Sequence, residues 1–302
     1  MIVAAFYRFV RLDGLAALRS RLEGLADGLG LRGTILLAEE GINGGLFGAR
    51  EALEAFMAAL VQDARFAAMP ARLSEAAPGN PVFHRLKVRI KPEIVSLGRP
   101  EADPLRATGQ RVAASDWNAL LDRPDVPVVD VRNAYETAIG GFPGSLDPGT
   151  RRFRDFPAFV EEALNPDAHP EVALCCTGGI RCEKASAYLL ELGFETVHQL
   201  DGGILNYLAS VPAQESRWCG DCFVFDQRVA VDGQLRQGRH RQCFACRRPL
   251  APQDLKSPQY REGVSCPHCH GQLNDAQRAG FAERHRQVAL AEARGGQHIG
   301  SS

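Results

Sequence analysis

Two adjacent cysteines followed by glycines and an arginine form the strongest candidate for covalent chemistry in the chain. Residues 172–184 read VALCCTGGIRCEK, so Cys175 and Cys176 end a run of strand-forming residues. Ligands of parallel sheets bind beyond the carboxyl ends of the strands, where this loop is expected. Gly178 and Gly179 let backbone N–H groups converge, and the following helix adds its positive end. Such a cradle lowers the pKa of a cysteine below about 8.5 and makes it nucleophilic.

The spacing to Arg181 offers two registers for this loop. Counted from Cys175 it is C-x5-R, as in cysteine phosphatases, and counted from Cys176 it is C-x4-R, the shorter loop of rhodaneses. We expect Arg181 to fix a positive charge there and the reactive sulfur to lie at the rim of a cleft. Cys182 is either a resolving thiol or a small residue packed at a helix start. The residues between the cysteine and the arginine are Thr177, Gly178, Gly179 and Ile180.

The flanking sequence favours the second register. CCTGGIRCEKASAYLLELGFETVHQLDGGILNY resembles the rhodanese pattern of a C-x-x-G-x-R loop, an amphipathic helix, a short strand and LDGG. Upstream, VVDVRNAYETAIGGFPGSL resembles the rhodanese segment with DVR, E and GHIPGA, with Gly141 and Phe142 in place of the usual His and Ile. The resemblance makes Cys176 the nucleophile, which rhodaneses use as a persulfide carrier, and Cys175 a buried strand residue. It assigns supporting roles to Asp130, Arg132 and Glu136.

The positioning elements fall into blocks along the chain. Residues 1–98 read strand, helix, strand, strand, helix, strand, the order of a ferredoxin-like (acylphosphatase-like) α+β domain. Residues 99–110 form a linker that carries Pro and Gly. Strands and helices alternate over 111–213, which predicts an α/β domain whose parallel sheet has helices on both faces. A cysteine-rich region follows over 214–288, and 289–302 is expected to be a flexible tail.

Composition limits the classes of function. The 302 residues are 45% hydrophobic and 24% charged with a net charge of -1, which indicates a soluble protein of two or three domains. Nucleic acid therefore has to bind through local clusters of cations. The sequence offers no signal peptide and no apolar run of the ~20 residues that a membrane helix needs, so we predict a cytoplasmic protein without a membrane partner. Nine cysteines in that compartment favour catalysis or metal binding over disulfides.

One predicted strand carries a row of cations. HRLKVRIKPEIVSLG, residues 84–98, alternates apolar and basic residues and is expected to be the fourth strand of the first domain. The cations repeat every ~6.6 to 6.8 Å along the strand, a spacing that suits phosphates, although a solvated sheet face would show the same pattern. The basic strand comprises Arg85, Lys87, Arg89 and Lys91. A second arginine cluster comprises Arg151, Arg152 and Arg154.

The cysteine-rich region predicts a structural metal site. Cys243 and Cys246 form CFAC, Cys266 and Cys269 form CPHC, and nineteen residues separate the two pairs. This spacing is typical of four-cysteine zinc sites, whose closed thiolate shell stabilises a small fold and leaves no position for catalysis. A third pair, CGDC at 219–222, is an alternative to one of these pairs, and metal-free reduced thiols are another alternative.

The whole chain resembles the bacterial tRNA uridine hydroxylase family of rhodanese-like proteins. The resemblance rests on LLAEEGING, CTGGIRCEKA, CFVFDQRVAV and SCPHCH and runs from about residue 3 to residue 285. It implies oxygen-dependent hydroxylation of the wobble uridine, position 34 in the anticodon loop of tRNA, to 5-hydroxyuridine, with Cys176 as the essential cysteine. Molecular oxygen would be a co-substrate. No flavin, haem or NAD site is evident in the sequence, nor is an obligatory protein partner.

Chemical reasoning adds a hypothesis and leaves alternatives. Attack of a thiolate on uracil C6 makes C5 carbanion-like and able to meet an oxygen electrophile, after which elimination restores the ring. A sulfurtransferase that carries a cysteine persulfide would use the same Cys176. A phosphatase is disfavoured by the loop register and by the lack of an obvious aspartic acid just beyond the loop. A non-enzymatic zinc-bearing adaptor is the last alternative.

Overall fold

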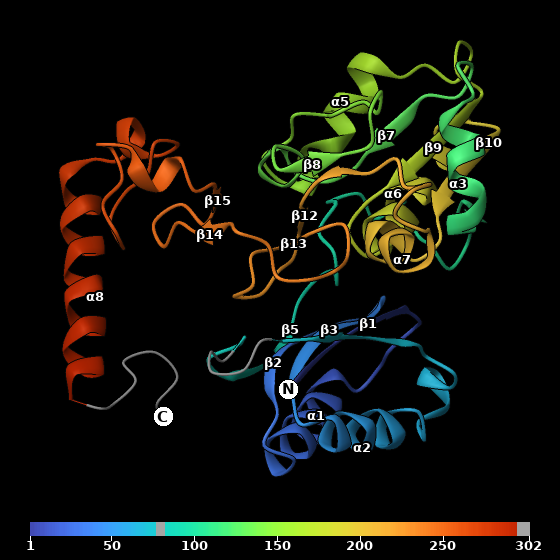
Figure 1. Cartoon of the computed structure of the whole chain (residues 1–302). Coiled ribbons are helices and arrows are strands. Elements are labelled where there is room, and N and C mark those ends of the chain that lie inside the picture. Colours follow the sequence, from blue (N-terminus) through green and yellow to red (C-terminus); the bar gives the residue numbers. More distant parts are fainter. Residues whose placement is uncertain (77–81, 295–302) are drawn as a thin grey trace.

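The chain begins with a five-stranded sheet that carries both helices of this part on one face (Figure 1). A computed structural model describes residues 1–76 and 82–294. The strand order is β4-β1-β3-β2-β5. The elements are β1 (Ile2–Phe9), α1 (Leu15–Gly28), β2 (Arg32–Ala38), β3 (Gly41–Gly48), α2 (Arg50–Leu60), a 3-10 turn (Ala64–Phe66), β4 (Ala71–Glu75) and β5 (Leu86–Ile90).

The sequence placed the basic strand fourth in this sheet, and that assignment is wrong. The fourth strand is the short β4, which pairs antiparallel with β1. The basic strand supplies β5, a fifth strand that pairs parallel with β2 at the other edge. β4 escapes prediction because its residues ARLSE are mostly polar and stand between Pro70 and residues 77–81.

The two faces of the sheet have different surroundings. Ile2, Ala4 and Phe6 pack with α1 and α2 in the main core of this part. Because side chains alternate along a strand, Tyr7 on β1 and Arg72 on β4 point to the opposite face. That face is turned towards the second part of the chain (Figure 1). The sheet therefore presents polar side chains to its neighbour.

The second part is a parallel four-stranded sheet in the order β6-β10-β9-β7. Its helices lie on both faces, as the alternating pattern predicted. The elements are β6 (Gln110–Val112), α3 (Ala114–Leu121), β7 (Val128–Asp130), α4 (Ala134–Thr137), β8 (Gly140–Gly141), a 3-10 turn (Phe153–Asp155), α5 (Phe156–Ala163), β9 (Glu171–Cys175), α6 (Ile180–Glu191), β10 (Thr196–Leu200) and α7 (Gly203–Ser210).

The two cysteines at the end of β9 belong to different cores. Cys175 packs with Trp117 of α3 and Tyr207 of α7. Cys176 packs on the other side of the sheet, with Cys182 and the rest of the α6 face. Alternation along the strand thus separates two residues that are adjacent in sequence.

The region after residue 213 contributes to two separate cores. Its first segment joins the second part, because β11 (Cys219–Gly220) pairs with β8, and Trp218 and Cys222 are buried in that core. β12 (Cys222–Phe223) and β13 (Ala230–Val231) form a hairpin between the first two parts (Figure 1). The remaining elements are β14 (Arg241–Gln242), β15 (Pro249–Leu250), two 3-10 turns (Asp254–Lys256 and His270–Gln272) and α8 (Asp275–Ala293).

The long final helix passes the expected start of the tail at residue 289. Residues 295–302 of the expected tail lie outside the described residues. Over the described ranges, no helix combines the length and the apolar character that crossing a bilayer requires.

Candidate functional site

The loop between β9 and α6 closes around the sulfur of Cys176. Gly179 precedes α6 with a φ of 98°, in the region that favours glycine, and its N–H lies 3.2 Å from Cys176 Sγ. Cys182, one turn into the helix, offers its backbone N–H and its thiol to the same sulfur. The predicted convergence of N–H groups is therefore present in the structure.

These contacts change the ionisation of Cys176. Burial alone would raise its pKa, but the Cys182 thiol, the charge of Arg181 and the backbone N–H groups together lower the pKa from 9.0 to about 6. The pKa of Cys182 itself is raised well above 9.0, by burial and by the neighbouring thiolate. At neutral pH, Cys176 is an ionised sulfur that accepts a hydrogen bond from a protonated Cys182.

Cys175 has the opposite chemistry. It is completely buried on the other side of the sheet, and burial, followed by the charge of Asp130, raises its pKa well above 9.0. A neutral thiol in an apolar core is inert. The geometry therefore supports the C-x4-R register.

Arg181 is held by a buried carboxylate. Its guanidinium makes two parallel hydrogen bonds with Glu136, of 2.6 and 2.7 Å, and the carboxylate of Glu136 is completely buried. Glu136 also accepts from the N–H of Asn133 at the start of α4, which fixes the carboxylate. The fork of Arg181 is thus occupied by Glu136, and its effect on Cys176 is the effect of its charge.

A second buried pair, Asp130 and Arg132, lies at the end of β7. Arg132 Nη2 is 2.6 Å from Asp130 Oδ2, and Arg132 also donates to Gly140 O at 2.6 Å. The Arg132 guanidinium stacks 5.0 Å from the ring of Trp218. This pair joins β7, β8 and the segment before β11, so its contacts support the fold around the loop.

The LDGG sequence supports the cysteine loop from the side. Ile204 N donates to Cys176 O at 2.9 Å, and Leu205 N donates to Thr177 O at 3.1 Å. A Cβ at Gly203 would lie 2.7 Å from Gly179 N, closer than real Cβ atoms approach. Glycine at this position allows the start of α7 to contact the loop.

The first part of the chain contributes residues that sequence reasoning missed. Tyr7 on β1 donates to Glu183 Oε1 at 2.8 Å, and Arg111 donates to the same oxygen at 2.7 Å. Burial, followed by the charge of Glu183, raises the pKa of Tyr7, so its hydroxyl stays protonated. Arg72 on β4 donates to Gly202 O, beside the LDGG turn. Both side chains lie within electrostatic reach of Cys176.

Further ion pairs join the first part to α6. Lys184 is almost completely buried, and its Nζ lies 2.6 Å from Glu40 Oε2 and 2.6 Å from Glu93 Oε1. Ile180, the first residue of α6, packs against an apolar cluster that includes Phe9. The sheet is therefore fixed against the loop by charged and apolar contacts together.

This packing changes one expectation from the sequence. We expected the reactive sulfur at the rim of an open cleft, but Cys176 and Cys182 each have 0% exposed surface. The sulfur is enclosed because the first part of the chain covers the loop with Tyr7 and Arg72. An isolated rhodanese pattern in the sequence carries no information about this covering domain.

The predicted cations are placed on two surfaces. Within the basic strand, Arg85, Arg89 and Lys91 are exposed and Lys87 is half-buried. Burial, followed by repulsion from its neighbours Arg85 and Arg89 and from Arg247 of the cysteine-rich region, lowers the pKa of Lys87. The second arginine cluster is exposed around the turn at 153–155. Positive charge thus gathers at the β5 edge of the sheet.

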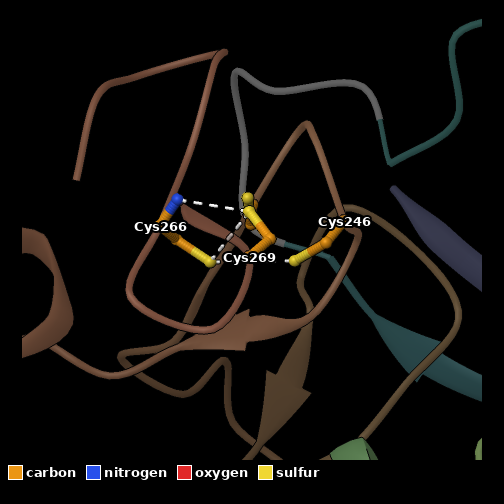
Figure 2. A group of neighbouring side chains, drawn as sticks. Cys246, Cys266 and Cys269 are labelled. Carbon is orange, nitrogen blue, oxygen red and sulfur yellow. Dashed lines mark hydrogen bonds between the residues drawn. The ribbon is translucent and has the colours of Figure 1, made fainter. Parts of the chain in front are cut away.

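The two later cysteine pairs form one cluster. The sulfur atoms of Cys243, Cys246, Cys266 and Cys269 all lie within 4.8 Å of one another. Figure 2 shows three of them, with Cys266 Sγ 3.7 Å from Cys246 Sγ and 3.6 Å from Cys269 Sγ. A tetrahedral ion with bonds of about 2.3 Å to sulfur requires separations of about 3.8 Å. The cluster can therefore hold a metal ion.

The third pair does not join the cluster. Cys219 is exposed in β11, and Cys222 is buried in β12 among residues of the rhodanese-like part. The four clustered cysteines share their own small core with Leu250. The alternative in which Cys219 and Cys222 replace one pair is not what the structure shows.

Comparisons with known proteins identify the family. A tRNA uridine(34) hydroxylase from Mesorhizobium japonicum is 50% identical over 99% of this chain and 96% of its own. The chain belongs to the tRNA uridine(34) hydroxylase family. A hydroxylase of the same name from Sinorhizobium fredii is 47% identical over 99% of this chain and 95% of its own. The resemblance found in the sequence is therefore confirmed.

Two models of domain families divide the hydroxylase chain as its fold does. A UPF0176 acylphosphatase like domain matches residues 1–94, and a rhodanese-like domain matches residues 113–210. A crystal structure of a rhodanese-like domain protein from Staphylococcus aureus aligns with 32% of this chain and 90% of its own at 25% identity and a TM-score of 0.28. The predicted fold class is confirmed.

Proposed function

We propose that this protein hydroxylates C5 of uridine 34 in tRNA and that the thiolate of Cys176 is its reactive group. The family supports the reaction. The observation that carries the role of Cys176 is its pKa of about 6, held there by Cys182, Arg181 and backbone N–H groups. A buried thiolate at neutral pH is a nucleophile that has already lost its proton.

The proposed chemistry starts with addition to the pyrimidine. The thiolate of Cys176 forms a bond to uracil C6, and the electron pair of the C5–C6 double bond moves into an enolate over C5 and O4. C5 then takes one oxygen atom from molecular oxygen, and an external two-electron reductant converts the other atom to water. Loss of the C5 proton expels the thiolate and restores the double bond.

Three neighbours of the sulfur have separate roles in this proposal. Cys182 donates a hydrogen bond to the thiolate and keeps its own proton. Arg181, fixed by Glu136, supplies positive charge without reacting. Arg72 brings a second buried cation from the first part of the chain. Both charges favour the ionised sulfur over the neutral thiol.

We further propose that tRNA binds with its backbone along the sheet of the unit formed by residues 1–98. Lys87 and its neighbours lie on the side of β5 opposite the main core, which is also the side on which Tyr7 points to the loop. Three strand spacings, about 14 Å, separate β5 from β1. Phosphates on the basic strand would leave a splayed anticodon base within reach of the unit formed by residues 111–213.

The four-cysteine cluster is proposed to bind zinc. Four thiolates at tetrahedral spacing suit zinc, and such a closed shell is structural. The residues around it bury only a small core, so the ion would supply much of the stability of this segment. Metal analysis of the purified protein, with and without Cys266→Ser, tests the assignment.

The decisive experiment is nucleoside analysis of tRNA from cells that lack the protein. Expression of the wild type or of Cys175→Ala should restore 5-hydroxyuridine at position 34, whereas Cys176→Ala should not. Equal restoration by all three proteins would refute the role of Cys176. Absence of the nucleoside change with the wild type would refute the reaction.

A sulfurtransferase remains the second candidate because it would use the same thiolate. It predicts transfer of sulfur from thiosulfate to cyanide by the purified protein, with loss in Cys176→Ala. That activity without any change in 5-hydroxyuridine would favour the sulfurtransferase over the hydroxylase.

A further inference from the structure

An exposed aromatic ring lies against the arginine of the cysteine loop. Phe225 is in the turn that joins β12 to β13, and 61% of its surface is exposed. The guanidinium of Arg181 lies 5.6 Å from the centre of its ring. Phe223 packs edge-on against it, with ring centres 5.2 Å apart. The ring is thus supported from inside the protein and open to solvent outside.

The hairpin that carries Phe225 is fixed rather than loose. Arg228 is almost completely buried, pairs with Asp226 at 2.6 Å, and donates to Ser74 Oγ of β4 at 2.8 Å. These bonds fix the turn to the sheet that covers the cysteine loop. The position of the Phe225 ring is therefore determined by contacts with both large parts of the chain.

The same turn contains a strained residue. Val229 has a φ of 66°, which is unfavourable for a β-branched side chain. Its N–H donates to Asp226 O at 3.0 Å, and its carbonyl accepts from Val224 N at 3.0 Å, so the tight turn requires this conformation. Strain of this kind persists where the surrounding structure enforces it and is concentrated at functional sites.

We propose that Phe225 is the platform on which the uracil of uridine 34 stacks before it reaches Cys176. This inference rests on the proposed function. Proteins recognise unpaired bases by stacking them on aromatic rings and arginine planes, and here a ring backed by a guanidinium adjoins the reactive loop. The nearby cations of the basic strand favour an RNA over an apolar protein segment as the occupant.

Binding of an anticodon stem-loop RNA tests the proposal directly. Phe225→Leu removes the aromatic face but keeps an apolar side chain, and it should weaken binding about 5- to 150-fold. Phe225→Trp should retain binding because it restores the ring. Phe244→Leu is the matched control, since Phe244 is also exposed and has Arg247 5.7 Å from its ring centre. It should bind like the wild type.

A second RNA without a base at position 34 identifies the stacked base. Phe225→Leu should bind this abasic RNA as well as the wild type does, because the stacking partner is already missing. An equal loss on both RNAs, equal binding of the normal RNA by Phe225→Leu and the wild type, or an equal loss in Phe244→Leu would each overturn the proposal.

The two levels of the argument fail differently. If the wild type leaves uridine 34 of tRNA unmodified, the proposed function fails. If the wild type hydroxylates uridine 34 while Phe225→Leu binds the stem-loop normally, only the role of Phe225 fails. Circular dichroism of Phe225→Leu should match the wild type, because the ring is mainly at the surface.

Discussion

Removing the thiol of Cys182 should raise the pKa of Cys176. The Cys182 thiol is the largest of the favourable contributions that hold the sulfur of Cys176 ionised against the penalty of burial. Cys182→Ala deletes this donor and leaves the charge of Arg181 and the N–H of Gly179 in place. The thiolate should therefore persist only at higher pH.

The size of the effect follows from the bond that is lost. A hydrogen bond to a charged group contributes about 1.5 to 3 kcal/mol. At 1.36 kcal/mol for each pH unit, the midpoint of Cys176 ionisation should rise by about 1 to 2 pH units. The ionised fraction at pH 7 would fall from about nine-tenths to roughly a quarter for a rise of about 1.5 pH units.

The assay is the ultraviolet absorbance of the thiolate as a function of pH. Subtracting the profile of Cys176→Ser from that of each protein isolates the titration of Cys176 from those of the other cysteines. Cys182→Ser is the matched variant, because its hydroxyl still donates to the sulfur and should keep the midpoint near 6. Cys175→Ala, which removes a thiol from the other side of the sheet, should also keep it there.

Two results would refute this reasoning. A midpoint unchanged in Cys182→Ala would mean that the thiol does not stabilise the charge. A normal midpoint in Cys182→Ser combined with loss of 5-hydroxyuridine would mean that Cys182 acts as a redox partner, since only a thiol can resolve a disulfide or persulfide.

The same pKa makes stability depend on pH. Cys176 titrates near 6 in the folded protein and near 9.0 when unfolded, so the unfolded chain binds the extra proton between these values. The free energy of unfolding should rise with pH across this window and be lost as pH falls towards 6. Cys176→Ser should remove that part of the rise in urea titrations.

Three other changes test the surroundings of the loop. Glu136→Gln leaves the charge of Arg181 buried without a partner and should lower the free energy of unfolding by about 3 to 5 kcal/mol in urea titrations. Replacing Arg85 and Arg89 by Gln should reduce the salt dependence of single-stranded RNA binding by about 0.7 in the logarithmic slope for each lost phosphate contact, and unchanged slopes would exclude such contacts. Cys266→Ser should release metal and increase hydrogen exchange around the cluster while β9 and α6 stay protected.

Sequence reasoning succeeded where the chemistry is encoded by local spacing. The C-x4-R loop, the LDGG turn and the two cysteine pairs are each short patterns whose residues must meet because the chain between them is short or its partners are fixed. Glu136 also belonged to such a pattern. Its pairing with Arg181 nevertheless spans 45 positions and emerged only from the fold.

The contacts between domains were beyond the sequence. Tyr7 and Arg72 occupy the non-core face of β1 and β4, and their only signal is a polar residue in an alternating strand. Such a residue usually faces water, so no rule assigns it to a distant loop. β4 was missed as well, and without it Arg72 had no predicted place.

These same contacts govern access to the reactive sulfur. A base cannot bond to an atom that has no exposed surface, and Cys176 has none in this conformation. Tyr7, Arg72 and Lys184 hold the covering sheet against α6 through buried polar bonds, which have to loosen before C6 of a uracil can meet the thiolate. The enclosure that prevents access also excludes water and other oxidisable partners from an ionised sulfur. A rhodanese loop that was always open would lack this protection, so the covering domain is part of the site as much as the loop itself.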